Sequence, residues 1–286
     1  MTQHYLYCGL VLESPREISS LDFPERNTQP DITIRHTRLR RPTSGNMTFG
    51  PNWAVTKDEG WWWLQDRVCF YIRPERIEID AREVEDSLVH ALMLEAPMVM
   101  AMIFRAQFCL PAAAVTVQDK AILFCGAAGS GRSTAAVRQA LTGELVIADS
   151  VARIELNEHE AMVIPQGSGS LLWPESLEKL GIAHKLTTAV RGDSLIRRIK
   201  LDSCLTPRII DQIFWRNPYS GEDPPYIETK RQNALNERQR FRRLALATAG
   251  RLWIDPAHRT AEHFRWCLSI ARHCPLSTAP QRFFEW

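Results

Sequence analysis

Alternating apolar and polar residues run through the first part of the chain and predict β-strands. Residues 31–36 alternate between polar and apolar, as a half-buried strand does. Residues 5–12 predict another strand, and residues 68–72 and 76–80 predict a hairpin with a proline in its turn. We therefore expect a β-rich N-terminal domain over residues 1–80.

Three consecutive tryptophans, Trp61 to Trp63, stand out in this region. They form either a ligand platform or a strand with aromatic side chains on both faces. Because successive side chains of a strand point to opposite faces, the pattern favours the strand. Residues 37–60 hold scattered Pro, Gly, Thr and Asn, which is typical of a long loop.

Helical spacing replaces alternation over residues 81–110. Val84, Leu88 and Leu92 recur every four residues, and Pro97 suits the first turn of a second helix. We expect these helices to connect the N-terminal domain to the rest of the chain. Their apolar stretch is too short to span a bilayer, so no membrane association is expected.

A strand, a Gly-rich loop and a helix form the centre of the chain. Residues 113–117 and 121–125 predict two strands, and a helical pattern follows residue 134. The loop has the spacing of a P-loop, with arginine at the position of the usual lysine. The candidate nucleotide-binding residues are Gly126, Gly129, Ser130, Gly131, Arg132, Ser133 and Thr134.

The chemistry of such a loop depends on its backbone. Glycines let successive N–H groups converge on a phosphate, and the N-terminus of the following helix adds partial positive charge. Ser133 is placed to give its hydroxyl to Mg²⁺. Arg132 keeps the charge of lysine but is longer and forked, so we expect phosphate binding to survive and transfer geometry to suffer. The alternative is a Gly-rich turn that only joins a strand to a helix.

A second polar group follows the next predicted strand. Residues 145–148 are apolar and end at Asp149, where P-loop nucleotide-binding proteins place a carboxylate associated with Mg²⁺. The alternative is an aspartate that caps the strand, and the nearby loop favours the functional interpretation. Asp149 and Arg132 are the catalytic candidates, and Ser133 and Asp149 are the metal candidates.

The rest of the chain predicts further strands and helices. The basic helix predicted over residues 229–243 suits either a nucleic acid or solvent, and solvent is favoured. Residues 166–170 predict a flexible loop from which no ligand follows. The other predicted elements cover 151–156, 161–164, 172–177, 195–200, 260–273 and 281–286.

Composition and charge narrow the classes of function. The chain has 286 residues, 45% hydrophobic and 24% charged, which is ordinary for a soluble globular protein. Its net charge of +2 disfavours a nucleic acid partner. The seven cysteines form no Cys-x-x-Cys pair, which disfavours a zinc or redox site, and no N-terminal signal peptide is visible. We expect a cytoplasmic protein.

The chain resembles the P-loop serine kinases related to HPr kinase/phosphorylase, particularly the HPr-kinase-like proteins found beside peptide-modification systems, including lasso-peptide kinases. The resemblance rests on residues 110–115, the loop 126–134, the strand ending at Asp149, and the Leu-Trp-Pro-Glu-Ser-Leu run at 172–177. It implies an α/β fold in which a P-loop, HPr-kinase-like domain with a central sheet spans residues 111–286. It also implies ATP and Mg²⁺ as cofactors, a peptide or small-protein acceptor, and a homo-oligomer.

Three positions depart from the pattern of this family. Pro111 stands where relatives usually carry a histidine, Arg132 where they carry a lysine, and Ser150 where they carry a second aspartate. Phosphoryl transfer depends on positioning and charge neutralisation, and one lost electrostatic donor costs about 10²–10³ in rate. Two hypotheses stay open: an ATP-dependent serine kinase, or a catalytically weak pseudokinase that serves as a scaffold or regulator.

The resemblance also implies roles for individual residues. Asp149 takes the position of a base or metal-associated group. Basic residues after the short helix contribute to phosphate or substrate contact in relatives, and Arg197 and Arg198 are the nearest candidates here.

Overall fold

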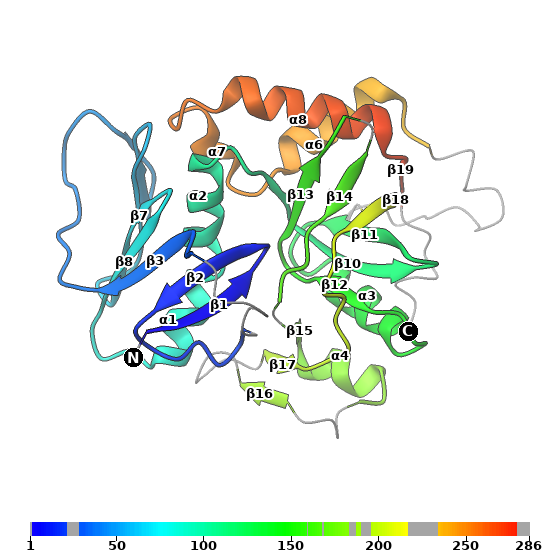
Figure 1. Ribbon diagram of the computed structural model, residues 1–286, viewed down its shortest axis with the longest axis horizontal. Coiled ribbons are helices and arrows are strands. Elements are labelled where there is room, and N and C mark those ends of the chain that lie inside the picture. Colours follow the sequence, from blue (N-terminus) through cyan, green and yellow to red (C-terminus); the bar gives the residue numbers. More distant parts are fainter. Residues whose placement is uncertain are drawn as a thin grey trace. The chain divides into compact units, whose positions relative to one another are not determined.

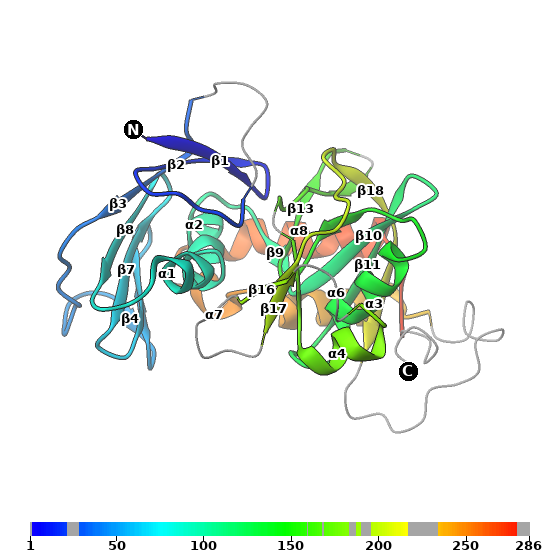
Figure 2. The same cartoon turned by 90° about the horizontal axis from the view of Figure 1, so that it is seen from below.

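The computed structural model describes residues 2–21, 29–158, 160–167, 169–182, 187–189, 196–216 and 234–278 (Figures 1 and 2). The chain divides into two compact units. Among the described residues, the first comprises those up to 108 and residues 250–263, and the second comprises the others. The strand predicted over 281–286 and the start of the basic helix predicted over 229–243 lie outside the described residues.

The first unit is built on one mixed sheet, which is the β-rich region expected over residues 1–80. Its strands follow the order β1-β2-β3-β8-β7-β6-β5-β4. They are β1 (Gln3–Tyr7), β2 (Leu10–Ser14), β3 (Ile32–His36), β4 (Thr48–Phe49), β5 (Trp53–Val55), β6 (Gly60–Leu64), β7 (Val68–Arg73) and β8 (Arg76–Ala81).

Two predictions in this sheet were wrong in part. The single strand expected over residues 5–12 is the hairpin of β1 and β2, because Cys8 and Gly9 take left-handed φ angles of 51° and 73° and turn the chain back. The long loop expected over residues 37–60 contains β4 and β5, which pair with each other and continue the sheet to β6. The hairpin of β7 and β8 is confirmed.

The tryptophan run is a strand with aromatic side chains on both faces, as the alternation predicted. Trp62 packs against Phe70, a fully buried residue of β7, with ring centroids 5.8 Å apart. Its neighbour Trp61 lies beside the half-buried Tyr71, at 4.7 Å between centroids. Successive residues of β6 therefore serve the core and the outer face in turn.

Helices α1 (Asp86–Met93), α2 (Ala96–Phe104) and α7 (Arg251–Ile254) belong to the same unit. Pro97 lies in the first turn of α2, as predicted, and α2 packs against β6, β7 and β8. Among the described residues, one stretch, Asp86–Phe104, is long and apolar enough to cross a membrane. It is split between α1 and α2 and 78% buried, which is how a core helix of a soluble protein is placed.

The second unit contains a curled sheet with the strand order β12-β10-β11-β18-β14-β13-β9, with β19 paired to β18. A small sheet has the order β15-β17-β16. The strands are β9 (Cys109–Leu110), β10 (Ala112–Val117), β11 (Lys120–Gly126), β12 (Val146–Ala148), β13 (Ala152–Leu156), β14 (Ala161–Val163), β15 (Ser170–Leu172), β16 (Thr187–Ala189), β17 (Arg197–Ile199), β18 (Arg208–Arg216) and β19 (Leu276–Thr278).

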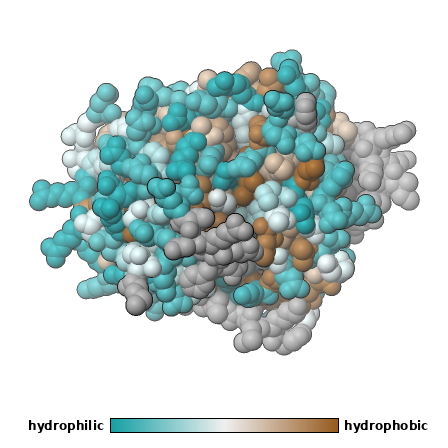
Figure 3. Space-filling view, viewed as in Figure 1, coloured by the Kyte–Doolittle hydropathy of each residue, from teal (hydrophilic) through white to brown (hydrophobic). Residues whose placement is uncertain are grey.

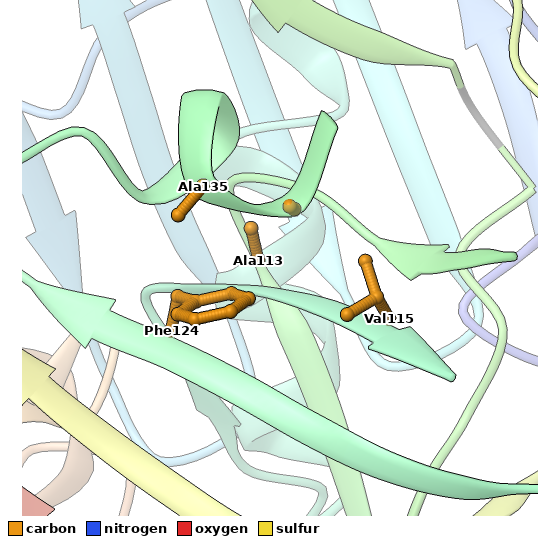
Figure 4. Close-up of a cluster of buried hydrophobic side chains, with 5 residues drawn as sticks. Ala113, Val115, Phe124 and Ala135 are labelled. Carbon is orange, nitrogen blue, oxygen red and sulfur yellow. The ribbon is translucent and has the colours of Figure 1, made fainter. Parts of the chain in front are cut away.

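Helices α3 (Arg132–Ala140), α4 (Pro174–Lys179) and α6 (Glu237–Ala247) complete this unit, together with the last part of α8 (Thr260–His273). The core fixes α3 on the sheet: Ala135 and Ala136 of α3 pack on Ala113, Val115 and Phe124 of β10 and β11 (Figure 4). The small alanines let helix and strands approach closely. Residues 127–131 then join the end of β11 to the start of α3.

Candidate phosphate-binding site

The Gly-rich loop joins the end of β11 to the start of α3 and depends on its glycines. Gly126, Gly129 and Gly131 have φ angles of 153°, 78° and 83°, in a region that other residues rarely adopt. Gly131 is the residue that precedes the first turn of α3, and no side chain of the described residues caps this helix. The N–H groups of the first turn are therefore directed at the loop, as in an anion site.

Asp149 lies at the centre of a hydrogen-bond cluster at this helix end. Its Oδ1 accepts from the Ser133 hydroxyl at 2.6 Å and from the Ser150 N–H at 2.8 Å. Its Oδ2 accepts from the Leu171 N–H at 2.7 Å. Two predicted site residues, Ser133 and Asp149, are thus brought into contact across 16 positions of sequence.

The pKa of the Asp149 carboxyl group is set mainly by its burial. The residue is only 2% exposed, and burial raises the pKa of its carboxyl group above the ordinary value of 3.8. The bonds from Ser133, Leu171 and Ser150 oppose this shift, and so does the charge of Arg132. Desolvation prevails, so Asp149 holds a proton more readily than an exposed aspartate does.

Arg132 is the first residue of α3, and the groups around it satisfy its guanidinium group only in part. Burial lowers the pKa of its guanidinium group, and the charge of Asp149 opposes this shift. Its Nη1 atom is buried and has no hydrogen-bond partner in the described part of the chain. A buried donor without an acceptor is costly, so a phosphate oxygen would relieve it. The nearby Cys125 thiol stays neutral, because burial raises its pKa to about 12.

Two other predicted binding residues lie in the loop and in the first turn of α3. Ser130 is buried, and its N–H donates to the Ala127 carbonyl at 3.1 Å, which closes the loop. The Thr134 hydroxyl donates to the Ser176 hydroxyl of α4 at 3.4 Å, so this side chain links two helices. Only the backbone N–H of Thr134 remains for an anion at the helix end.

The segment before β15 supplies groups that sequence reasoning missed. Gln166, expected in a flexible loop, is 4% exposed, and its side-chain oxygen accepts from the Asp149 N–H at 2.7 Å. The Leu171 N–H, which binds Asp149, comes from the first strand of the small sheet. Hydrogen bonding by a backbone N–H has no sequence signal, and a glutamine three residues after the end of β14 is at most a weak one.

Pro111 and Ser150, two of the positions that depart from the family pattern, lie at the edge of the sheet where β11 and β12 end. Because β10 is antiparallel to β11 and β12, its start adjoins their ends: Ala112 pairs with Cys125, and Ala114 with Ala148. Pro111, which precedes β10, therefore stands at the edge where the loop begins. Ser150 follows Asp149 with a φ of 68°, a strained angle for a serine that directs its N–H onto the carboxylate.

Arg197 and Arg198 lie on β17, which pairs with β15 in the small sheet. Arg198 stands opposite Leu171, the residue whose N–H binds Asp149. The described residues contain no group of three or more His, Cys, Asp or Glu side chains that would hold a metal ion. Within the part of the chain that the structure describes, the candidate metal ligands are the Ser133 hydroxyl and the Asp149 carboxyl group.

Comparison with known proteins shows no family for this chain. No family model matches it, and no curated protein matches it. Among solved structures, the HPr(Ser) kinase/phosphatase from Coxiella burnetii is similar over 42% of this chain and 73% of that one, with a TM-score of 0.29 and 10% identity. A similarity this low carries no argument about activity, so function has to be inferred from the site.

Proposed function

We propose that the second unit binds ATP with Mg²⁺ and transfers a phosphoryl group to a serine of a peptide or small protein. One observation carries the proposal: the Ser133 hydroxyl and the buried Asp149 carboxylate meet at 2.6 Å beside the start of α3, after three glycines with positive φ. Strand, glycine loop, helix, hydroxyl and carboxylate are the parts that a P-loop phosphotransferase needs.

The residues present fit both cofactors. A hydroxyl oxygen and a carboxylate oxygen are the kind of ligands Mg²⁺ takes, so Ser133 and Asp149 would hold the ion. The orphaned Nη1 of Arg132 and the N–H groups of the first turn of α3 suit phosphate oxygens. Bound Mg²⁺ would neutralise phosphate charge.

Asp149 is the group that would orient or deprotonate the acceptor hydroxyl. Its raised pKa increases its affinity for a proton, which is the property that a general base needs. Arg132 would neutralise charge on the phosphate, with a forked guanidinium in place of a compact ammonium.

A second candidate, a weak pseudokinase that binds nucleotide and acts as a scaffold or regulator, is favoured by a specific observation. Ser133 and Ser150 already donate to Oδ1 of Asp149 and Leu171 donates to Oδ2, so an acceptor hydroxyl would have to compete with them. Pro111 supplies no donor or proton carrier at the same edge. Misplacing one catalytic group by about 1 Å costs about 10²-fold in rate.

The experiment that separates the two candidates measures ADP formation from Mg²⁺-ATP with a library of serine peptides. A matched library in which alanine replaces serine is the control. A kinase forms ADP only with the serine library, and Asp149→Asn abolishes it. A pseudokinase is silent until Pro111→His, Arg132→Lys and Ser150→Asp are combined. If both the natural protein and the triple variant stay silent while folded, the phosphotransferase proposal is wrong.

A further inference from the structure

The first unit contains a cleft lined by arginines. Its volume is about 280 Å³, and it lies between β7, β8 and the segment that follows β3. Arg41, Arg67 and Arg82 line it together with the buried Cys69. We call it the arginine cleft. It is smaller than most drug-sized ligand pockets and suits a single side chain or a carboxyl group.

The surrounding sequence adds to its positive charge. Four arginines fall within residues 35–41, and residues 32–57 contain no Asp or Glu. Figure 3 shows that hydrophilic residues cover most of the surface over β3, β7 and β8. Burial raises the pKa of Cys69 to about 11, so this residue brings no negative charge to the cleft.

Two carboxylates also line the cleft, and they differ in how they are held. Asp80 is mostly buried and accepts from the Leu39 N–H at 3.1 Å and from Arg82 at 3.4 Å. Asp66 is fully exposed and meets Arg41 at 3.0 Å. An exposed ion pair of this kind contributes little to stability. Asp66 is therefore a carboxylate that another carboxylate can replace.

Arg41 is held ready for such an exchange. Its guanidinium group lies 5.7 Å from the ring centre of Trp63, and it also donates to the Gln65 carbonyl. A guanidinium group that is stacked on an indole loses little freedom when it binds an anion. The exchange of Asp66 for an incoming carboxylate thus needs no new ordering of Arg41.

From this geometry we propose that the arginine cleft binds a carboxylate of an acidic peptide segment, which displaces Asp66 from Arg41. The proposal rests on the proposed function in one respect, since the acceptor peptide is the source of that segment. A peptide fits better than a nucleic acid, because the outward-facing tryptophan rings already have partners: Tyr71 on Trp61, and Arg41 on Trp63. Base stacking needs an open ring.

The test measures binding of fluorescent ten-residue peptides to the full chain at low salt. One peptide is rich in Asp and Glu, a second carries Asn and Gln at the same positions, and a single-stranded oligonucleotide of equal charge is the third probe. Arg41→Ala is expected to weaken the acidic peptide about tenfold, and Asp66→Asn to strengthen it about two- to fivefold. Asp211→Asn is the control, because Asp211 forms a half-exposed ion pair with Lys120 in the second unit.

Each outcome decides the proposal. Selective binding of the acidic peptide, with opposite effects of Arg41→Ala and Asp66→Asn and no effect of Asp211→Asn, supports it. Equal or tighter binding of the oligonucleotide overturns it in favour of nucleic acid, and no binding at millimolar peptide overturns it outright. Binding that ignores both substitutions places the peptide elsewhere and also overturns it. Asp66→Asn alone is sufficient if Arg41→Ala does not fold. ATP binding is measured in parallel, so failure of the kinase proposal is seen separately.

Discussion

Replacing Asp149 by asparagine is expected to destabilise the second unit by an amount that follows from the hydrogen bonds of its carboxyl group. The carboxylate accepts three hydrogen bonds, from Ser133 and Ser150 on one oxygen and from Leu171 on the other. Asparagine offers one oxygen and one NH₂ group. In either orientation of the amide, one backbone N–H then faces another N–H donor, so one of the three bonds is lost.

The magnitude follows from that single loss. A hydrogen bond to a charged group contributes about 1.5–3 kcal/mol, and the neutral amide escapes part of the cost of burying charge. We expect Asp149→Asn to lower the free energy of unfolding by about 1–2 kcal/mol. Asp149→Ala leaves two backbone N–H groups without their acceptor, at about 1–3 kcal/mol each, and is expected to lower the free energy of unfolding by about 2–6 kcal/mol.

The pH dependence of the free energy of unfolding gives a second, independent test of the buried Asp149 carboxyl group. Because burial raises the pKa of folded Asp149 above 3.8, the folded state holds this proton more tightly than the unfolded state does. The stability that this proton contributes is complete below pH 3.8 and is lost as pH rises through the folded pKa. The advantage of the natural protein over Asp149→Asn should therefore be larger in acid than at pH 8.

Urea unfolding of the three proteins between pH 3 and pH 8 measures both effects. Asp211→Asn, at a half-exposed ion pair in the same unit, is the control and should change the free energy of unfolding by less than about 0.5 kcal/mol. The reasoning is refuted if Asp149→Ala is as stable as the natural protein. It is also refuted if the difference between the natural protein and Asp149→Asn grows with pH.

Three further substitutions or conditions test other parts of the structure. Gly129→Ala and Gly143→Ala both place a side chain at positive φ with open space around it. Each should lower the free energy of unfolding in urea by about 1–2 kcal/mol. Calorimetry should show weaker nucleotide binding only for Gly129→Ala. Phe124→Ala should lower the free energy of unfolding by about 3–5 kcal/mol, and a loss below about 1 kcal/mol would contradict its core position. Burial lowers the pKa of His90 below 6.5, against the opposing charge of Asp86. The stability that neutral His90 contributes to the first unit should therefore be complete above pH 6.5 and fall as the pH drops through the pKa of folded His90. A tryptophan-monitored urea midpoint that is constant from pH 7 to pH 5 would contradict this.

Local patterns carried most of the strand and helix predictions. The strands β7 and β10 follow apolar runs, β8 follows an alternating run and α3 follows helical spacing, and all are present. The split of residues 5–12 into two strands was not predicted, because Cys8 takes a left-handed angle that its residue type does not indicate. The central strand β18 was also missed, since its polar residues interrupt the apolar run.

The site was predictable only where its chemistry lies in side chains with a known spacing. The glycines, Ser133 and Asp149 were named from sequence, and the structure places Ser133 and Asp149 in contact. Gln166 and the Leu171 N–H were not, because a backbone donor is available at any residue and only the tertiary fold selects it. The pairing of Arg41 with Asp66 in the arginine cleft was not predicted for the same reason: the two residues are 25 positions apart in sequence, and only the tertiary fold brings them together.

A calorimetric titration with Mg²⁺-ATP tests the central claim most directly. The natural protein is expected to bind saturably, and Arg132→Ala should weaken binding about tenfold or more, because it removes a charge-assisted donor to phosphate. Arg138→Ala, on the same helix but beyond its first turn, is the control and should bind as the natural protein does. Absence of binding by the natural protein at millimolar nucleotide would contradict the account, and so would equal binding by Arg132→Ala.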